Sequence, residues 1–350
     1  MNEIDNDSFQ KSHKNVTIID VARASGVSYS TVSRVLNGYE FVKEDTRQRV
    51  LEAAEKLGYV ANLQARSLAG GHSNIIGVLV PGLDNSYIGE IIRGVDEELA
   101  RANYDLMLYT THRQRGHEQR YVNTIANGLT DGLLLVVPEV PTDYLKALSE
   151  KSFPHVLIDQ SNVRDSSSMV DSTNWQGAYD ATRYLIELGH RRIGFITGMM
   201  ELSSAGERLD GYRAALTDHS IPFLPELVAP GDFWQRSGHK SGLQLLDLPA
   251  PPTAIFASND LMAFGLMEAI RERNLSVPED ISIVGFDDIP QSSIVYPPLT
   301  TVRQPLDQMG RVAARLLLEQ IENPDRPPRR VTLATQLIIR ESCAALKERG

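Results

Sequence analysis

One short run of residues combines apolar side chains with hydrogen-bonding side chains at helical spacing. It spans residues 28–37, SYSTVSRVLN. At 100° per residue Val32, Val35 and Leu36 fall on one side of a helix, and only hydrogen-bonding side chains fall on the other. That polar arc consists of Tyr29, Ser30, Ser33, Arg34 and Asn37. Guanidinium, hydroxyl and amide groups are the ones that pair with base edges in a major groove. The pattern favours a DNA-reading helix, although the solvated face of a plain three-helix scaffold would show the same periodicity.

The sequence around this helix supplies the elements that would position it. A capping-box-like start at Thr17, with Asp20 in place of the usual Glu or Gln, opens a first helix that stops at Gly26. Ser28 can cap the second helix. A third helix is expected at about 44–57, with its apolar side chains on one face and Gly58 as its stop. Two short helices joined by a turn that contains glycine are typical of a helix-turn-helix.

A second group of polar and aromatic residues follows the ends of predicted strands, where a small ligand would bind. These residues are Tyr87, Asp159, Ser204, Arg208, Asn259, Asp287, and either Phe233 or Trp234. Together they offer carboxylate and guanidinium groups for hydroxyls and rings for the apolar face of a sugar. Each also has a structural interpretation, because Asn259 can cap a helix, Arg208 can lie on a helix surface and Tyr87 can belong to a core.

The predicted elements beyond residue 74 alternate between strands and helices. Strands are expected at 75–80, 104–110, 132–137, 155–159, 192–197, 253–258, 281–286 and 331–339. Helices are expected at about 87–102, 113–127, 174–188, 206–218, 235–246, 260–273 and 305–321. Continuously apolar strands between amphipathic helices indicate parallel sheets covered on both faces. Two such runs predict two α/β lobes, with ligands outside the carboxyl ends of the strands.

Composition restricts the class of protein. The chain has 350 residues, 42% of them hydrophobic, a net charge of −10 and one cysteine. A single cysteine, Cys343, excludes an internal disulfide framework and fits a reducing cytoplasm. The polar N-terminus has no apolar core of a secretory signal, and no apolar run approaches the roughly 20 residues of a membrane span. Residues 14–74 hold eight Lys and Arg against six Asp and Glu, so the net negative charge lies in the rest of the chain. This asymmetry fits a small DNA-binding module on an acidic body, although chance variation could also produce it.

Two long segments carry a resemblance to a known family. VTIIDVARASGVSYSTVSRVLNG and TRQRVLEAAEKLGYVANLQARSLAG closely resemble the headpiece and hinge of the lactose-repressor/galactose-repressor (LacI/GalR) family, and PTAIFASNDLMAFG, DISIVGFDDI and PPLTTVRQP resemble its sensor. The resemblance covers about residues 15–340. It implies an α-helical helix-turn-helix headpiece followed by a two-lobed α/β sensor domain of the type I periplasmic-binding-protein-like fold.

The domain boundaries follow from this resemblance and from the predicted elements. We expect a disordered tail (1–14), the headpiece (15–60), a hinge helix and linker (61–74), the sensor (75–340) and a terminal tail (341–350). Within the sensor, the N-lobe is expected at about 75–172 and 303–321, and the C-lobe at about 173–302 and 330–340.

The resemblance assigns roles in DNA binding. It implies base or phosphate contacts for Tyr29, Ser30, Ser33 and Arg34, and backbone contacts for Thr17, Asn37 and Asn62; Ser28, Thr31 and Arg66 complete the expected DNA-binding set. Paired hinge helices would place Leu68 as a wedge in the minor groove, unless Leu68 is a linker residue that packs on the body. An isolated helix of about eight residues is marginal in water, so the hinge would order only with a partner hinge and DNA. The chain differs from the usual family sequence at two positions: it has Lys43 where Ser is usual, and Ala61 where Pro is usual.

The resemblance also implies a small-molecule effector. It supports Arg208, Asp287 and Asn259 most, and adds Gln304 at the crossover between the lobes. The purine-responsive branch has Arg at the position of Leu202 and Trp at that of Gln160, so we expect a sugar. The implied function is a homodimeric, cytoplasmic repressor of carbohydrate-utilisation genes that binds a near-palindromic DNA operator. We expect no cofactor, no metal ion, no membrane contact and no catalysis.

Two other classes of protein, a sugar-binding protein and an enzyme, are the alternatives to a DNA-binding regulator. An extracytoplasmic sugar-binding protein shares the two-lobed fold but would have a signal peptide and would lack residues 16–70. An enzyme would show a catalytic motif such as G-x-S-x-G or H-E-x-x-H, and neither occurs.

Overall fold

The chain divides into two compact units, residues 1–73 and 74–350. The computed structural model describes residues 16–36, 39, 41–59, 72–112, 120–122, 129–138, 142–160 and 167–346. The predictions for the N-terminal tail, for Asn37, Asn62, Arg66 and Leu68, and for most of the helix at 113–127 fall outside the described residues.

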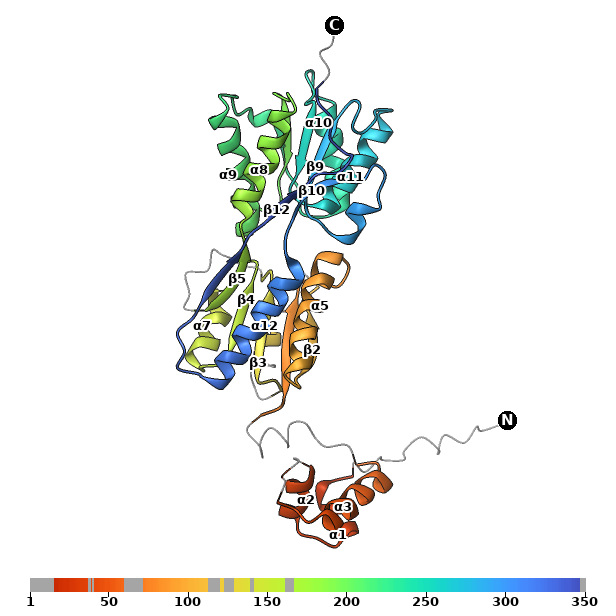
Figure 1. Ribbon diagram of the computed structural model, residues 1–350, viewed down its shortest axis with the longest axis vertical. Coiled ribbons are helices and arrows are strands. Elements are labelled where there is room, and N and C mark those ends of the chain that lie inside the picture. The colour runs from red at the N-terminus through yellow and green to blue at the C-terminus, as the bar shows by residue number, and fades with distance from the viewer. Residues whose placement is uncertain are drawn as a thin grey trace, which may run out of the picture. The chain divides into compact units, whose positions relative to one another are not determined.

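The described residues of the first unit form the helices α1 (Ile18–Ser25), α2 (Tyr29–Leu36) and α3 (Glu44–Leu57). They enclose a small core in which Val21, Val32 and Val50 are completely buried. The Asp20 carboxylate accepts hydrogen bonds from the Thr17 backbone N–H and hydroxyl, at 2.9 and 2.7 Å. Gly26 and Gly58 end α1 and α3 with φ of 68° and 62°, a conformation that glycine adopts without strain. The predicted helix-turn-helix is confirmed (Figure 1).

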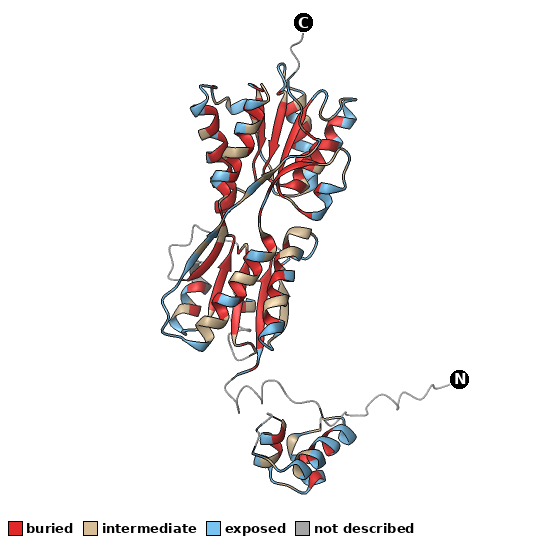
Figure 2. Cartoon of the chain, viewed as in Figure 1, coloured by how far each residue is buried: buried red, intermediate tan, exposed pale blue. Residues whose placement is uncertain are grey.

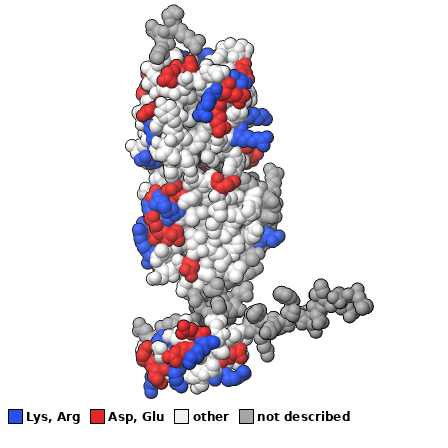
Figure 3. All heavy atoms as spheres, turned by 90° about the vertical axis from the view of Figure 1, so that its right-hand side faces the viewer, with Lys and Arg blue, Asp and Glu red and all other residues white. Residues whose placement is uncertain are grey.

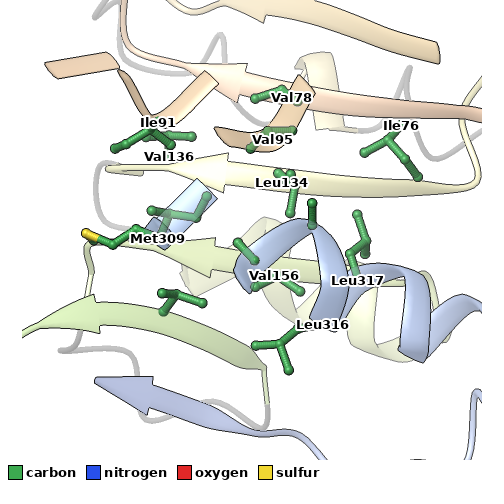
Figure 4. Packing of buried hydrophobic residues seen from close by; sticks show 14 of the residues in the cluster. Ile76, Val78, Ile91, Val95, Leu134, Val136, Val156, Met309, Leu316 and Leu317 are labelled. Carbon is green, nitrogen blue, oxygen red and sulfur yellow. The ribbon is translucent and has the colours of Figure 1, made fainter. Parts of the chain in front are cut away.

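The N-lobe of the second unit is a parallel six-stranded sheet. Its strands lie in the order β11-β5-β4-β3-β1-β2. They comprise β1 (Ile75–Val80), β2 (Asp105–Thr110), β3 (Gly132–Val136), β4 (His155–Ile158), β5 (Ser168–Ser172) and β11 (Arg330–Leu333). Helices α5 (Ser86–Arg101) and α12 (Leu306–Glu322) cover one face, and α7 (Thr142–Glu150) packs on the other. Figure 4 shows Met309, Leu316 and Leu317 of α12 meeting Leu134 and Val156 of the sheet.

The C-lobe repeats this arrangement. Its sheet has the order β12-β10-β9-β8-β6-β7, with only β12 antiparallel to its neighbour. The strands comprise β6 (Ile193–Ile196), β7 (Val228–Ala229), β8 (Ala254–Ala257), β9 (Ser282–Asp287), β10 (Thr300–Arg303) and β12 (Gln336–Ile338). Helices α8 (Asn174–Glu187) and α9 (Ser203–Asp218) cover one face, and α10 (Gln235–Leu246) and α11 (Asp260–Glu272) the other (Figures 1 and 2). Two 3-10 turns, Pro225–Leu227 and Pro290–Ser293, complete the lobe.

Three segments cross between the lobes, and they correct one predicted boundary. Residues 173–174 lead from β5 into α8, residues 303–305 lead from β10 into α12, and residues 334–335 lead from β11 into β12. We call these the crossover segments. The prediction of a single strand at 331–339 is therefore wrong, because two strands, β11 and β12, occupy this segment. The prediction that residues 330–340 belong to the C-lobe is wrong for β11, which joins the N-lobe sheet, and correct for β12, which joins the C-lobe sheet.

Among the helices and strands of the sensor, α7, β5, β7 and β10 were not predicted. All four are short, and α7, β5 and β10 contain polar residues. The predicted tail at 341–350 packs on the C-lobe as far as residue 346. There the Ser342 hydroxyl donates to the Ile283 carbonyl at 2.7 Å, and the Leu346 N–H donates to the Leu188 carbonyl at 2.8 Å.

The surface formed by α5 and α12 carries interleaved charges rather than a patch of one sign (Figure 3). Arg93 pairs with Glu90 and Glu97, and Arg311 with Glu97. Exposed pairs of this kind contribute little to stability. No helix in the described ranges is both long and apolar enough to cross a membrane.

Candidate functional site

The second helix of the headpiece presents its polar arc to solvent. Val32 and Val35 are 0% and 3% exposed, whereas Tyr29 is 53% exposed and Ser30 and Arg34 are exposed as well. Ser33 is half-buried. The predicted orientation of the helix is confirmed, because the three-helix core covers only its apolar side.

Two hydroxyls of the predicted DNA-binding set also serve the fold. The Ser28 hydroxyl accepts from the Thr31 N–H at 3.2 Å and lies 2.9 Å from the Thr31 hydroxyl. Ser28 therefore caps α2 as predicted, and its exposed position leaves it able to face a phosphate. Thr17 is exposed at the start of α1.

A cleft lies between the two lobes of the sensor, at the carboxyl ends of the parallel strands. Seven of the eight predicted effector residues line it: Tyr87, Asp159, Ser204, Arg208, Phe233, Asn259 and Asp287. The remaining lining residues are Pro81, Asn85, Ile88, Val137, Met199, Leu202, Leu261 and Ile289. The sheet topology explains why residues so far apart in sequence meet here.

Two buried carboxyl groups face the cleft from opposite lobes. Asp159 follows β4 of the N-lobe and Asp287 ends β9 of the C-lobe. The Tyr87 hydroxyl donates to Asp159 Oδ2 at 2.6 Å. Burial raises the pKa of Asp159 and that of Asp287, while the positive charge of Arg208 opposes both shifts. The cleft therefore holds two acceptor groups in a poorly hydrated environment.

Arg208 organises the C-lobe wall of the cleft. It is 2% exposed. Its Nε donates to Asn174 Oδ1 at 2.9 Å, its Nη1 donates to the Ser258 carbonyl at 2.6 Å, and Nη1 lies 3.8 Å from Asp287 Oδ1. The guanidinium carbon lies 3.8 Å from the centre of the Phe286 ring. The alternative that Arg208 is a surface residue of its helix is wrong.

Asn259 and Gln304 have structural partners of their own. Asn259 caps α11 by accepting from the Met262 N–H at 2.9 Å, and its Nδ2 donates to the Phe233 carbonyl at 3.0 Å, so it both lines the cleft and holds its wall. Gln304 is the exception among the predicted effector residues. It lies behind the cleft, where its Nε2 donates to Asp287 Oδ1 at 2.8 Å.

Four residues of the cleft adopt a left-handed backbone conformation that is costly for non-glycine residues. The φ values are 45° for Val137, 59° for Asp159, 69° for Phe233 and 113° for Asp287. Such conformations cost of order 1–3 kcal/mol each and concentrate at functional sites. Here they set the direction of two carboxylates and one aromatic ring.

Three helices begin at the cleft. Asn85 caps α5 by accepting from the Ile88 N–H at 3.0 Å, Leu202 precedes α9, and Asn259 caps α11. Helix N-termini carry partial positive charge, which partly compensates the two carboxylates.

The apolar residues that line the cleft were not predicted from the sequence. Ile88, Val137, Met199, Leu261 and Ile289 were not proposed, since an apolar residue after a strand looks the same in sequence whether it fills the core or faces a ligand. Asn85 could have been found from the sequence, because it is a favourable capping residue that stands two positions before the helix predicted at about 87–102.

Fold and site together define a DNA-binding regulator with a separate small-molecule sensor. The family model for bacterial regulatory proteins of the lacI family matches residues 17–62, and the model for a periplasmic binding protein-like domain matches residues 182–343. The HTH-type transcriptional repressor PurR of Proteus mirabilis is 38% identical over 94% of this chain and 97% of its own length.

Solved structures agree with these matches. The transcriptional regulator CelR in complex with cellobiose is 34% identical, with a TM-score of 0.73 over 93% of this chain and 99% of its own. The lac repressor dimer bound to operator and the anti-inducer ONPF is 29% identical, with a TM-score of 0.83 over 95% of this chain and 100% of its own. The chain belongs to the LacI family of bacterial transcriptional regulators. It is a DNA-binding repressor whose DNA binding is switched by an effector.

Proposed function

We propose that the effector is a neutral, unphosphorylated sugar bound in the interlobe cleft, and that the protein represses genes of carbohydrate utilisation. The observation that carries the proposal is the pair of buried carboxylates, one from each lobe, that face this cleft.

The charges of the cleft favour a neutral ligand. Arg208 is the one cation among the lining residues of the described structure, and Asp287 and the Ser258 carbonyl already engage it. An anionic ligand would lose its hydration in a site of low polarity, where the guanidinium is already engaged and where its charge would oppose ionisation of the two carboxyl groups. This disfavours phosphorylated sugars and nucleotides.

The hydrogen-bonding capacity suits hydroxyl groups. Among the described residues, no hydrogen-bond partner is found for Asp159 Oδ1 or Asp287 Oδ2, so both can accept from a ligand. The rings of Tyr87 and Phe233 offer apolar faces to a sugar. Leu202, which lines the cleft, stands where the purine-responsive branch has Arg. Gln160, which accepts a hydrogen bond from the Ser203 hydroxyl at 2.9 Å, stands where that branch has Trp. The cellobiose complex of a relative supports the same class of effector.

On the DNA side, we propose that the protein binds a near-palindromic operator as a homodimer, because one headpiece reads only a half-site. The proposed contacts of the described residues are those of Thr17, Ser28, Tyr29, Ser30, Thr31, Ser33 and Arg34. Leu83, Ile294 and Tyr296 are 58%, 79% and 87% exposed, and Gln291 Nε2 donates to Ser86 Oγ at 2.7 Å between their segments. This exposed apolar set supports association with a second copy. A cytoplasmic location and the absence of catalysis belong to the same proposal.

A matched ligand panel tests the effector class. The full chain would be screened by thermal shift against glucose, glucose 6-phosphate, cellobiose, cellobiose 6-phosphate and hypoxanthine, and then for release of genomic fragments retained on the protein. A neutral sugar that binds the native state raises the melting temperature, and its phosphorylated counterpart does not. Stabilisation by hypoxanthine or only by the phosphorylated sugars would overturn the proposal. Loss of sugar during the incubation would reveal an enzyme.

A further inference from the structure

The crossover segments are bonded to one another as well as to their own lobes. The Thr173 N–H donates to the Leu333 carbonyl at 3.0 Å, and the Thr335 N–H donates to the Thr173 hydroxyl at 2.9 Å. Ser172, the last residue of β5, is 3% exposed and stands directly before this contact. A change in the direction of the segment at 173–174 must therefore disturb the segment at 334–335.

One path of hydrogen bonds runs from the cleft to Ser172 through Gln304. Asp287 Oδ1 accepts from Gln304 Nε2 at 2.8 Å, and Gln304 Oε1 accepts from the Ser172 hydroxyl at 2.6 Å. The Gln304 N–H also donates to the Asp287 carbonyl at 3.2 Å. Gln304 is 3% exposed, so its amide has no competing solvent and both of its ends are committed.

A second path runs from the cleft to the same residue through Asn174. Arg208 Nε donates to Asn174 Oδ1 at 2.9 Å, and Asn174 Nδ2 donates to the Ser172 carbonyl at 3.3 Å. Asn174 is buried at the start of α8. The carboxyl group of Asp287 and the guanidinium group of Arg208 are thus each one amide side chain away from Ser172.

The N-lobe carboxylate of the cleft has no such connection. Asp159 accepts from the Tyr87 hydroxyl, and none of its side-chain hydrogen bonds within the described ranges reaches a crossover segment. The link between cleft and crossover is therefore specific to the C-lobe wall.

We propose that Gln304 and Asn174 are positioning residues that transmit the state of Asp287 and Arg208 to the crossover segments through Ser172. This inference rests on the proposed function, in which a ligand engages Asp287 and Arg208. A ligand that binds these two groups changes how firmly they hold Gln304 and Asn174, and the two amides then change how firmly Ser172 is held. An effector can shift the lobes only by such a difference in contacts between two arrangements.

The test uses amide hydrogen exchange of the full chain without any ligand, so that it does not depend on which effector binds. In Asp287→Ala, the amides of Thr173 and Thr335 are expected to exchange about 3- to 10-fold faster, the size of effect that follows from losing one hydrogen bond. Asp287→Asn keeps an acceptor for Gln304 and tolerates the positive φ, so its exchange should stay near that of the wild type.

Two further variants separate this link from general destabilisation. Asp159→Ala removes the other buried carboxylate of the cleft and should leave both amides unchanged. Ser172→Ala removes the hydroxyl that donates to Gln304 and so interrupts the first path, while the Ser172 carbonyl that accepts from Asn174 stays in place. Adding Asp287→Ala to it should therefore produce little further increase at Thr173 and Thr335. Gln304→Leu interrupts the same path without removing a cleft charge and should match Asp287→Ala.

Unchanged exchange at Thr173 and Thr335 in both Asp287→Ala and Gln304→Leu would overturn the inference. So would equal increases in Asp159→Ala, or full additivity of Ser172→Ala and Asp287→Ala. A failure of the sugar panel would refute the effector class and leave these exchange rates as predicted, so the two failures are distinguishable.

Discussion

Replacing Arg208 by methionine tests how the C-lobe wall of the cleft is stabilised. Methionine keeps an unbranched chain that can lie over Phe286, but it has no donor for Asn174 or the Ser258 carbonyl and no charge for Asp287. Because Arg208 is 2% exposed, its hydrogen bonds to Asn174 and the Ser258 carbonyl are shielded from solvent.

The expected loss of stability depends on pH. Removing one partner of a buried ion pair costs about 3–5 kcal/mol, and the 3.8 Å separation from Asp287 places Arg208 near the lower end. Arg208 lowers the pKa of Asp287, which burial has raised, so in the variant this pKa rises further. A carboxyl group with a raised pKa favours the folded state at low pH and loses that contribution as pH rises through the folded-state pKa. We therefore expect a loss of about 3 kcal/mol at pH 8 and a smaller loss at low pH, where Asp287 is protonated with or without Arg208.

Urea unfolding of the full chain at pH 8 and at low pH measures this loss. The two tryptophans, Trp175 and Trp234, both lie in the C-lobe, so their fluorescence reports the lobe that contains Arg208. Arg213→Met is the control, since the pair of Arg213 with Asp210 on the same helix is largely exposed and its loss should cost under about 1 kcal/mol. A loss below about 1 kcal/mol for Arg208→Met at pH 8, or an equal loss at both pH values, would contradict the reasoning.

Three further predictions concern other parts of the chain. Gly94→Ala should destabilise the N-lobe by about 3 kcal/mol in thermal unfolding, because its Cβ would lie within 1.9 Å of the Asp307 carbonyl oxygen, whereas Gly89→Ala on the same helix meets open space and should be neutral or slightly stabilising. Arg34→Ala should weaken specific DNA binding by about 1–3 kcal/mol, and an unchanged ratio of specific to non-specific affinity at fixed salt would remove Arg34 from base readout. Burial raises the pKa of Asp260 from 3.8 to about 7, so the stability of the wild type should decline between these pH values as the group ionises. Asp260→Asn should reduce this decline, measured as the difference in unfolding free energy between pH 5 and pH 8. An unchanged difference in the variant would contradict this role of Asp260.

The sequence was sufficient for features that depend on local periodicity. The headpiece helices end at Gly26 and Gly58 as predicted, and the polar arc that contains Tyr29 faces outward. Most cleft residues were also predictable, because parallel βα units bring the carboxyl ends of their strands to one edge. That rule needs only the position of each residue after its strand.

Features that depend on long-range pairing were not predictable. The segment 330–338 has a continuous strand pattern, and only its pairing partners divide it between two sheets. Gln304 was placed correctly at a crossover but assigned to the cleft, since sequence does not reveal that Asp287 and Ser172 occupy both ends of its amide. Strand β5 was missed because polar residues in SMVDS interrupt the apolar run by which a buried strand is recognised.

The unfavourable backbone angles of the cleft have an evolutionary consequence. At Val137, Asp159, Phe233 and Asp287 the backbone conformation restricts which side chains are tolerated, so an exchange there risks the surrounding loop as well as the contact. Met199, Leu202, Leu261 and Ile289 line the same space with ordinary backbone geometry. Descendants of this repressor that respond to new molecules should therefore differ first at these four apolar positions. The four residues with positive φ should remain unchanged while the ligand changes.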